Sequence, residues 1–185
     1  NLDSPLSTGL SGLLLLAEGW LLITGLLPLW LAWRRFPDRR RDVQNRHRDW
    51  QASEWRPHVD ILVPTYGEPL AVLQRSLLGC TQQSYPHTSV LVLDDAGRAE
   101  VKQLAKQLGC RYLHRPKRLH AKAGNLNAGL SRCDGELVAV FDADFIPQQR
   151  FLERSIGFLL DPAVALLQTP QSFINADPVM RNLRM

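Results

Sequence analysis

Apolar residues fall into one long run near the N-terminus and several shorter runs farther along the chain. Residues 10–33 are rich in leucine and include one charged residue, Glu18. A helix rises about 1.5 Å per residue, so this run is long enough to cross a hydrocarbon core about 30 Å thick. The pattern predicts a transmembrane helix, and the alternative is a helix buried in the core of a globular domain.

The residues around this run indicate how it would lie in a membrane. Trp30 and Trp33 stand near its end, where tryptophan anchors helices at the interface, and arginines follow directly. The positive-inside rule then places everything after residue 34 in the cytoplasm. A cleaved signal peptide is disfavoured, because its basic region would precede the apolar core. Glu18 inside lipid predicts that this helix packs against other helices.

Beyond residue 57, short apolar runs alternate with stretches of helical spacing. Strands are predicted at 59–63, 89–93, 110–113, 136–144 and 163–167. Helices are predicted at 70–83, 98–108, within 120–131 and at 149–160. Strands that alternate with helices imply a mostly parallel sheet with right-handed crossovers, so the predicted class is a Rossmann-like α/β layer. The polar residues 34–57 before it are predicted to form a linker or an interfacial helix.

The run 136–144 predicts the chemistry of the domain. It is apolar and β-branched and ends in two carboxylates, Asp142 and Asp144, which is typical of a buried central strand with an acidic tip. Ligands of open α/β sheets gather at the carboxyl ends of strands. Two oxygen donors one residue apart suit a divalent cation such as Mg²⁺. The alternative is a strand end followed by a solvated turn.

Two other predicted strands also end in polar residues. Thr65, Tyr66 and Glu68 follow the first strand, and Asp94 and Asp95 follow the second. In this topology the strand ends converge on one crevice, which would combine an acidic floor for a metal with side chains for a nucleotide.

Lys122 is a further candidate, at the start of a predicted helix. There it suits an anionic phosphate or packs its stem on a base; the alternative is an ordinary exposed lysine. No Gly-X-Gly-X-X-Gly follows the first strand and no Gly-Lys-Ser/Thr occurs, which argues against a dinucleotide oxidoreductase and a P-loop NTPase.

Charge and cysteine content indicate the binding partner and the redox compartment of the chain. The 185 residues carry a net charge of +4. The basic excess is concentrated in one segment that contains Arg34, Arg35, Arg39, Arg40, Arg41, Arg46 and Arg48. This cluster beside an apolar helix favours a membrane-flanking role over nucleic-acid binding. The three cysteines, Cys80, Cys110 and Cys133, have no Cys-X-X-Cys spacing and an odd count, so we interpret them as buried thiols in a reducing compartment.

A series of motifs resembles the catalytic subunits of bacterial cellulose synthases, which are processive, membrane-embedded family 2 glycosyltransferases with a GT-A fold. The motifs are Val-Pro-Thr-Tyr-Gly-Glu-Pro (63–69), Leu-Asp-Asp (93–95), His-Ala-Lys-Ala-Gly-Asn (120–125), Phe-Asp-Ala-Asp (141–144), Gln-Thr-Pro-Gln-Ser-Phe-Ile-Asn-Ala-Asp-Pro (168–178) and Arg-Asn-Leu (181–183). Each motif alone is weak, but their order and spacing together are specific. The resemblance covers roughly residues 10–185 and includes the helix with its Glu and Trp.

The resemblance implies catalytic roles for four carboxylates. Asp142 and Asp144 match the Asp-X-Asp that holds Mg²⁺ (or Mn²⁺) and the donor diphosphate. Asp94 and Asp95 match an acidic pair that contacts the uridine.

The resemblance also implies nucleotide-binding residues. Thr65, Tyr66, Glu68 and Lys122 match positions around the uracil and ribose, while residues 168–175 match a segment near the acceptor end and the channel entrance.

Two positions depart from the usual motifs of the family. Ala96 stands where the family usually has Gly, and Gly67 where it usually has Asn. Ala96 would restrict the backbone if that position required a positive φ.

The implied reaction is transfer of glucose from UDP-glucose to the 4-hydroxyl of a glucan acceptor, with inversion to a β-1,4 linkage. In the family a Thr-Glu-Asp motif supplies the base and a Gln-X-X-Arg-Trp motif holds the acceptor, and neither occurs here. We therefore expect a fragment of a longer protein, inactive alone: a membrane helix (1–33), a basic linker or interfacial segment (34–57) and the donor-binding half of a GT-A domain (58–185).

The implied setting is the bacterial inner membrane, with the catalytic domain in the cytoplasm and accessory subunits of a synthase complex as partners. Two alternatives remain. One is another β-glycan synthase (mannan, mixed-linkage or curdlan-type), and the other is a non-catalytic nucleotide-binding membrane scaffold.

Overall fold

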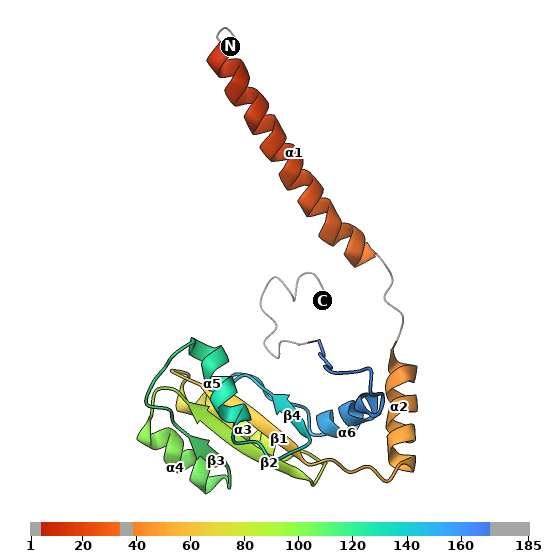
Figure 1. The fold of residues 1–185 in the computed structure, drawn as a ribbon, viewed down its shortest axis with the longest axis vertical. Helices are drawn as coiled ribbons and strands as arrows, with labels where there is room; N and C mark the ends of the chain where they lie inside the picture. Colours follow the sequence, from red (N-terminus) through yellow and green to blue (C-terminus); the bar gives the residue numbers. More distant parts are fainter. Residues whose placement is uncertain (1–4, 34–38, 171–185) are drawn as a thin grey trace. The chain divides into compact units, whose positions relative to one another are not determined.

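The computed structural model describes residues 5–33 and 39–170. The chain divides between Arg39 and Arg40 into two units, each described here by itself (Figure 1).

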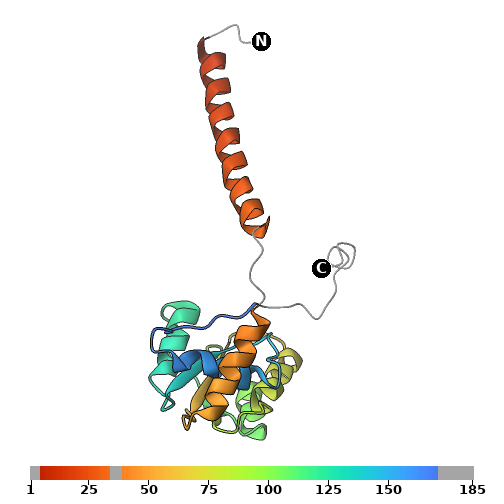
Figure 2. The ribbon, with the colours of Figure 1, turned by 90° about the vertical axis from the view of Figure 1, so that its right-hand side faces the viewer.

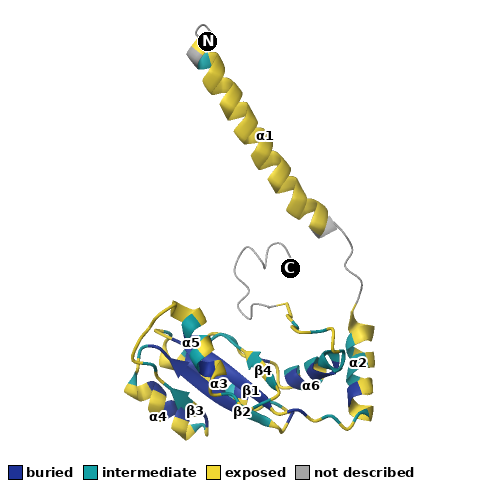
Figure 3. Ribbon diagram, in the orientation of Figure 1, coloured by how far each residue is buried: buried dark blue, intermediate teal, exposed yellow. Residues whose placement is uncertain are grey.

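The first unit contains helix α1, Pro5–Trp33. Its described leucine side chains are exposed along its length (Figure 3). Within it, Ser7–Leu31 is the one helical segment of the described residues that is long and apolar enough to cross a membrane, judged by length and composition. The predicted helix is confirmed, and it begins five residues earlier than expected.

The second unit is built on a four-stranded sheet with the order β3-β2-β1-β4, in which every neighbouring pair is parallel. The strands are β1 Val59–Thr65, β2 Thr88–Asp94, β3 Arg111–Leu113 and β4 Leu137–Val140. β1 and β2 are the buried centre, and Val59 pairs with Thr88 and Thr65 with Asp94 at the two ends of their register. All four strands therefore end at the same rim of the sheet.

Helices cover both faces of this sheet, because successive residues of a buried strand point to opposite sides. Ile61 and Val63 pack with Leu73 and Leu77, which belong to helix α3, Leu70–Thr81. Leu62 faces the other way, toward α5, Ala121–Leu130. Helix α4, Ala99–Gln107, lies on the α3 side, and the left-handed Gly109 follows it as predicted. The predicted α/β class is confirmed.

The basic segment 34–57, predicted to be a linker or an interfacial helix, contains a helix in its described part. Helix α2, Arg40–Ala52, belongs to the second unit and lies against α6, Phe151–Ser155, and the 3₁₀ helix η1, Ile156–Leu160 (Figure 2). Trp50 is buried, 5% exposed, and its ring meets that of Tyr85 edge-on. His47 Nδ1 lies 2.9 Å from the carbonyl oxygen of Glu153.

Two strand predictions are wrong. The run 136–144 is not a central strand: β4 covers only Leu137–Val140 and pairs with β1 alone among the described strands. Val138 and Val140 are 39% and 47% exposed, because no described element covers their side. Residues 163–167 form no strand, since none of the described strands pairs with them.

Candidate functional site

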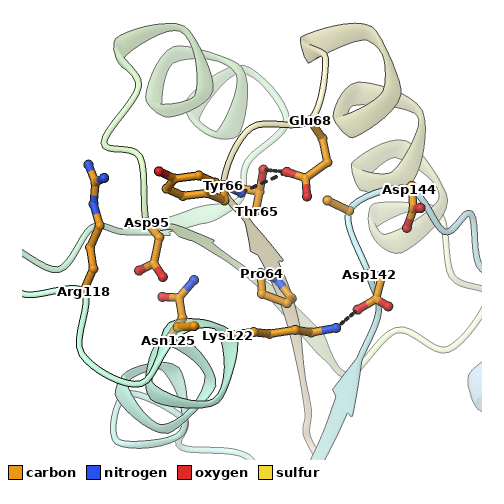
Figure 4. A pocket seen from close by; sticks show the side chains of 12 residues that line it. Pro64, Thr65, Tyr66, Glu68, Asp95, Arg118, Lys122, Asn125, Asp142 and Asp144 are labelled. Carbon is orange, nitrogen blue, oxygen red and sulfur yellow. Dashed lines mark hydrogen bonds and ion pairs between the residues drawn. The ribbon is translucent and has the colours of Figure 1, made fainter.

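A pocket of about 600 Å³ opens at the rim where β1, β2 and β4 end (Figure 4). Its lining residues come from three strand ends and from the start of α5: Pro64, Thr65, Tyr66, Glu68, Asp95, Arg118, Ala121, Lys122, Asn125, Asp142, Ala143 and Asp144. The structure thus brings together every candidate residue of the sequence analysis except Asp94.

The loop after β1 is folded around one carboxylate. Thr65 Oγ1 and the backbone N–H of Tyr66 both donate to Glu68 Oε2, at 2.6 Å and 2.9 Å. Burial pushes the pKa of Glu68 upward, but these hydrogen bonds outweigh it, and the pKa falls below its ordinary value of 4.5. Glu68 is therefore charged at neutral pH and holds the loop in one shape.

Asp94 is fully buried and does not line the pocket. Its carboxylate accepts hydrogen bonds from the backbone N–H groups of Ala96, at 3.0 Å, and Arg98, at 2.6 Å. A third bond comes from the hydroxyl of Tyr112, at 3.0 Å. Burial, and the hydrogen bond that the Tyr112 hydroxyl gives to the Asp94 carboxylate, raise the pKa of that hydroxyl to about 12. Asp94 thus fixes the turn between β2 and α4.

Arg98 connects that turn to the loop after β1. Its Nη1 donates to the carbonyl oxygen of Glu68 and its Nη2 to Thr65 Oγ1, both at 2.7 Å. Its Nε lies 3.8 Å from Asp94 Oδ1 and is the one buried side-chain nitrogen or oxygen in the described ranges without a hydrogen-bond partner. Sequence reasoning missed Arg98; its position four residues after Asp94, at the start of a helix, was the available signal.

Asp95, unlike Asp94, reaches the pocket, although it is only 6% exposed. Both of its oxygens accept hydrogen bonds from Arg115, at 2.6 Å and 2.7 Å. Such a fork-to-fork pair is specific to the guanidinium group. Arg115 was also missed, because nothing in the sequence joins it to a carboxylate twenty residues earlier.

Lys122 enters the pocket from a strained turn. His120 and Ala121, at the start of α5, have φ angles of 62° and 43°, which residues with a side chain rarely adopt. Lys122 forms an ion pair with Asp142, across the pocket from its own helix (Figure 4). Deeper in the wall, Asn125 is buried and donates to the carbonyl oxygen of Leu93 at 2.8 Å.

An aromatic ring and an arginine line the other end of the pocket. Tyr66 is 59% exposed, and the guanidinium carbon of Arg118 lies 5.5 Å from the centre of its ring. This distance is within the range of a cation–π contact. A flat, partly exposed ring beside a cation can stack on a planar group.

The Asp-Ala-Asp segment lies in the loop after β4. Ala143 is buried, while Asp142 and Asp144 on either side of it are partly or fully exposed and line the pocket. Two carboxylates at the edge of an open pocket fit Mg²⁺ or Mn²⁺, because such an ion takes one or two protein carboxylates and completes its shell with water and phosphate oxygens. Within residues 5–33 and 39–170, no three His, Cys, Asp or Glu side chains gather as a closed metal cage.

The two departures from the family motifs are compatible with this geometry. The positive φ after the acidic pair, 70°, belongs to Gly97, whereas Ala96 has an ordinary backbone conformation. A side chain at Gly67 would meet no atom within 4 Å. Of the segment 168–175, residues 168–170 have irregular backbone, and the rest lies outside the described residues, as does the motif at 181–183.

Comparison with known proteins gives a consistent result. Residues 60–185 match the profile of "Glycosyl transferase family 2". The chain is 41% identical over 136 residues to the UDP-forming cellulose synthase catalytic subunit of Pseudomonas fluorescens, which covers 72% of this chain and 18% of that protein. It is 40% identical over 182 residues to putative cellulose synthase 2 of Komagataeibacter xylinus, covering 96% of this chain and 12% of that protein. The chain thus spans less than a fifth of these relatives.

Solved structures agree on the fold. A mannosyltransferase from Pyrobaculum calidifontis in complex with GDP-Man and Mn²⁺ superposes with a TM-score of 0.53 at 28% identity, over 64% of this chain and 39% of that one. TarS of Staphylococcus aureus has a TM-score of 0.51 at 20% identity, over 62% of this chain and 23% of that one.

Proposed function

Because the chain belongs to glycosyl transferase family 2, we propose that it forms the donor-binding part of a cellulose synthase catalytic subunit. The intact enzyme would transfer glucose from UDP-glucose to the end of a β-1,4-glucan and release UDP. The observation that carries this proposal is that Tyr66 and Asp95 line the same pocket as the Asp142–Asp144 segment. One end suits a base and ribose, and the other suits a diphosphate.

The nucleotide end depends on Tyr66, Thr65 and Glu68. The Tyr66 ring is exposed for stacking, while Glu68 holds the loop through Thr65 and the Tyr66 backbone. Asp95 would contact the uridine from the opposite wall. We assign Asp94 a positioning role, because its oxygens are occupied by three protein donors and face away from the pocket.

The diphosphate end depends on Lys122, Asp142 and Asp144. The two carboxylates would hold Mg²⁺ or Mn²⁺, and the Mn²⁺ in the mannosyltransferase relative supports a divalent cation in this fold. When bound, such an ion offsets the negative charge that develops on the leaving diphosphate. The family resemblance places Lys122 around the uracil and ribose, but its ammonium group pairs with Asp142, so we assign it to the diphosphate oxygens instead.

Other steps fall to residues that these 185 do not provide. A carboxylate must take the proton from the attacking hydroxyl. The Thr-Glu-Asp and Gln-X-X-Arg-Trp motifs do not occur here, so we propose that they belong to another part of a longer protein. We also propose that α1 crosses the bacterial inner membrane, that residues 34–57 are a basic juxtamembrane segment and that the domain from residue 58 faces the cytoplasm. Accessory subunits of a synthase complex would be its partners.

The test is an assay of the full-length protein in membrane vesicles with labelled UDP-glucose. We expect a labelled polymer that a β-1,4-specific glucanase digests, and none from the Asp144→Asn variant. Two results would identify another β-glycan synthase: a polymer that resists the glucanase, or a polymer made from GDP-mannose. GDP-mannose is tested because the similar mannosyltransferase structure contains GDP-Man. Wild-type protein that neither makes polymer nor binds UDP with Mn²⁺ would identify a non-catalytic scaffold.

A further inference from the structure

We propose that Arg115 is a positioning residue that presents Lys122 to the donor diphosphate. This inference rests on the proposed function, in that it assigns Lys122 to a nucleotide diphosphate. Arg115 itself does not line the pocket.

Arg115 makes four hydrogen bonds within the protein. Its Nε and Nη2 donate to the two oxygens of Asp95, at 2.6 Å and 2.7 Å. Its Nη1 donates to the carbonyl oxygen of Leu119 at 2.6 Å, and Nη2 also donates to that of Ala121 at 2.7 Å. The side chains of Arg115 and Asp95 are only 11% and 8% exposed. One guanidinium therefore ties the end of β2 to the turn before α5.

That turn needs an external restraint. His120 and Ala121 both have positive φ angles, a conformation that neither side chain favours. Gly124 closes the turn by donating its N–H to the carbonyl oxygen of His120 at 3.0 Å. A Cβ at Gly124 would stand 2.0 Å from the carbonyl oxygen of Leu119, so the turn is also tightly packed. Arg115 binds the two carbonyls that flank His120, and it thereby opposes the relaxation of the strained residues.

This turn sets the backbone position of Lys122. The lysine follows Ala121 directly, and its ammonium group reaches Asp142 across the pocket (Figure 4). The lysine side chain is 56% exposed, so its own packing does little to fix its direction. The backbone from 119 to 121 fixes where the side chain begins. Arg115 acts on Lys122 through that backbone, whereas Asp95 also lines the pocket directly.

The chemistry requires an arginine at position 115. Lysine would keep the charge, but it has no planar fork to bind both oxygens of Asp95 and two carbonyls at once. We therefore expect Arg115→Lys to behave much like Arg115→Ala.

The experiment measures UDP binding in the presence of Mn²⁺ by calorimetry, on the full-length protein in detergent. We expect Arg115→Ala and Arg115→Lys each to weaken UDP binding about tenfold, the scale of one lost charge-assisted hydrogen bond. Lys117→Ala, an exposed residue of the same loop that does not line the pocket, is the matched control and should bind as wild type.

A double-mutant cycle separates positioning from a general loss of structure. In a Lys122→Ala background, Arg115→Ala should weaken UDP binding by no more than about threefold further, because the part of its effect that passes through Lys122 is already lost. The remainder passes through Asp95, which Arg115 also holds. Millimolar guanidinium should restore part of the binding of Arg115→Ala. Full multiplication of the two effects, or wild-type binding by Arg115→Ala, would overturn the inference. A wild-type protein that does not bind UDP would instead overturn the proposed function.

Discussion

The two acidic pairs of this domain look alike in sequence and differ completely in the structure. Asp94 and Asp95 are 0% and 6% exposed, and protein donors occupy the oxygens of both. Asp142 is paired with a single exposed lysine, and Asp144 is exposed at the edge of the pocket. Asp94 therefore shapes the pocket from outside it, Asp95 lines the pocket while Arg115 holds it, and the second pair is available to a cation.

The difference is caused by the residues that follow each strand. After β2, the chain turns so that two backbone N–H groups point at Asp94, and arginines from two elements arrive beside the pair. After β4, Ala143 is buried between the two carboxylates. In the described residues no backbone N–H donates to either carboxylate, and Asp142 accepts from Lys122. An acidic pair at a strand end can thus hold a cation only where protein donors do not already occupy its oxygens.

The largest expected effect comes from removing charge from Asp142 and Asp144, here called the open pair. Asp144→Asn should lower polymer synthesis by the full-length enzyme more than about a hundredfold, because one of two carboxylates for the cation is lost. Incorporation of labelled glucose at saturating Mg²⁺ measures it. Glu54→Gln, an exposed carboxylate outside the pocket, is the control and should keep wild-type activity. Unchanged synthesis by Asp144→Asn would remove this residue from the cation site.

Substitution in Asp94 and Asp95, here called the engaged pair, should change the stability of the fold. Asp94→Asn places an amide among groups that all donate hydrogen bonds, and it leaves Arg98 without its buried counter-charge. We expect the free energy of unfolding to fall by about 2–4 kcal/mol. The denaturant midpoint for proteolysis of the detergent-solubilised protein measures this change. Glu100→Gln, exposed on α4, should shift that midpoint little; an equally small shift for Asp94→Asn would contradict the structural role of Asp94.

The turn after the engaged pair offers a finer test. At Gly97 the φ angle is 70°, and an added Cβ would lie 2.8 Å from Cε1 of His114. Gly97→Ala should therefore destabilise the fold by about 1–2 kcal/mol. Ala96→Gly, which introduces the residue usual in the family, should destabilise it by no more than about 1 kcal/mol, through backbone entropy alone. The denaturant midpoints for proteolysis compare the two variants. A larger loss of stability in Ala96→Gly than in Gly97→Ala would contradict the assignment of the positive φ to residue 97.

The smallest effect concerns Lys122, the one cationic side chain in the described part of the chain that forms an ion pair with Asp142 or Asp144. Lys122→Met should strengthen Mn²⁺ binding in the absence of nucleotide about twofold to fivefold, the scale of an exposed ion pair, because Asp142 loses its competing partner. Electron paramagnetic resonance of free Mn²⁺ measures the affinity, with Lys117→Met as control. With UDP present the order should reverse, since Lys122 then contacts the diphosphate. Weaker Mn²⁺ binding without nucleotide would show that Lys122 does not compete with the metal.

The sequence predicted the elements of the fold better than the separate roles of the residues at the site. The run at 59–63 became the buried strand β1, and helices α3 and α4 began within one residue of their expected starts, because local hydrophobic spacing determines both. The run at 136–144 was wrongly assigned to the sheet centre, because apolar composition determines neither the order of strands nor the burial of β4, whose residues are partly buried or exposed. Position within a sheet depends on long-range pairing.

The supporting residues could not be predicted for a similar reason. Nothing local distinguishes Asp94 from Asp95; register and side-chain direction turn one inward and the other toward the pocket. Arg98 and Arg115 act on loops that are distant in sequence, so their roles appear only once the strand ends meet.

The position of β4 affects how this protein can be handled in solution. Within the described residues it has a single neighbouring strand, and two valines are exposed beside it. An open row of amide and carbonyl groups flanked by apolar side chains is a template on which another chain can stack. A soluble preparation of this domain therefore requires that a further strand or a covering segment occupy the free edge of β4, or else the molecules will assemble through it.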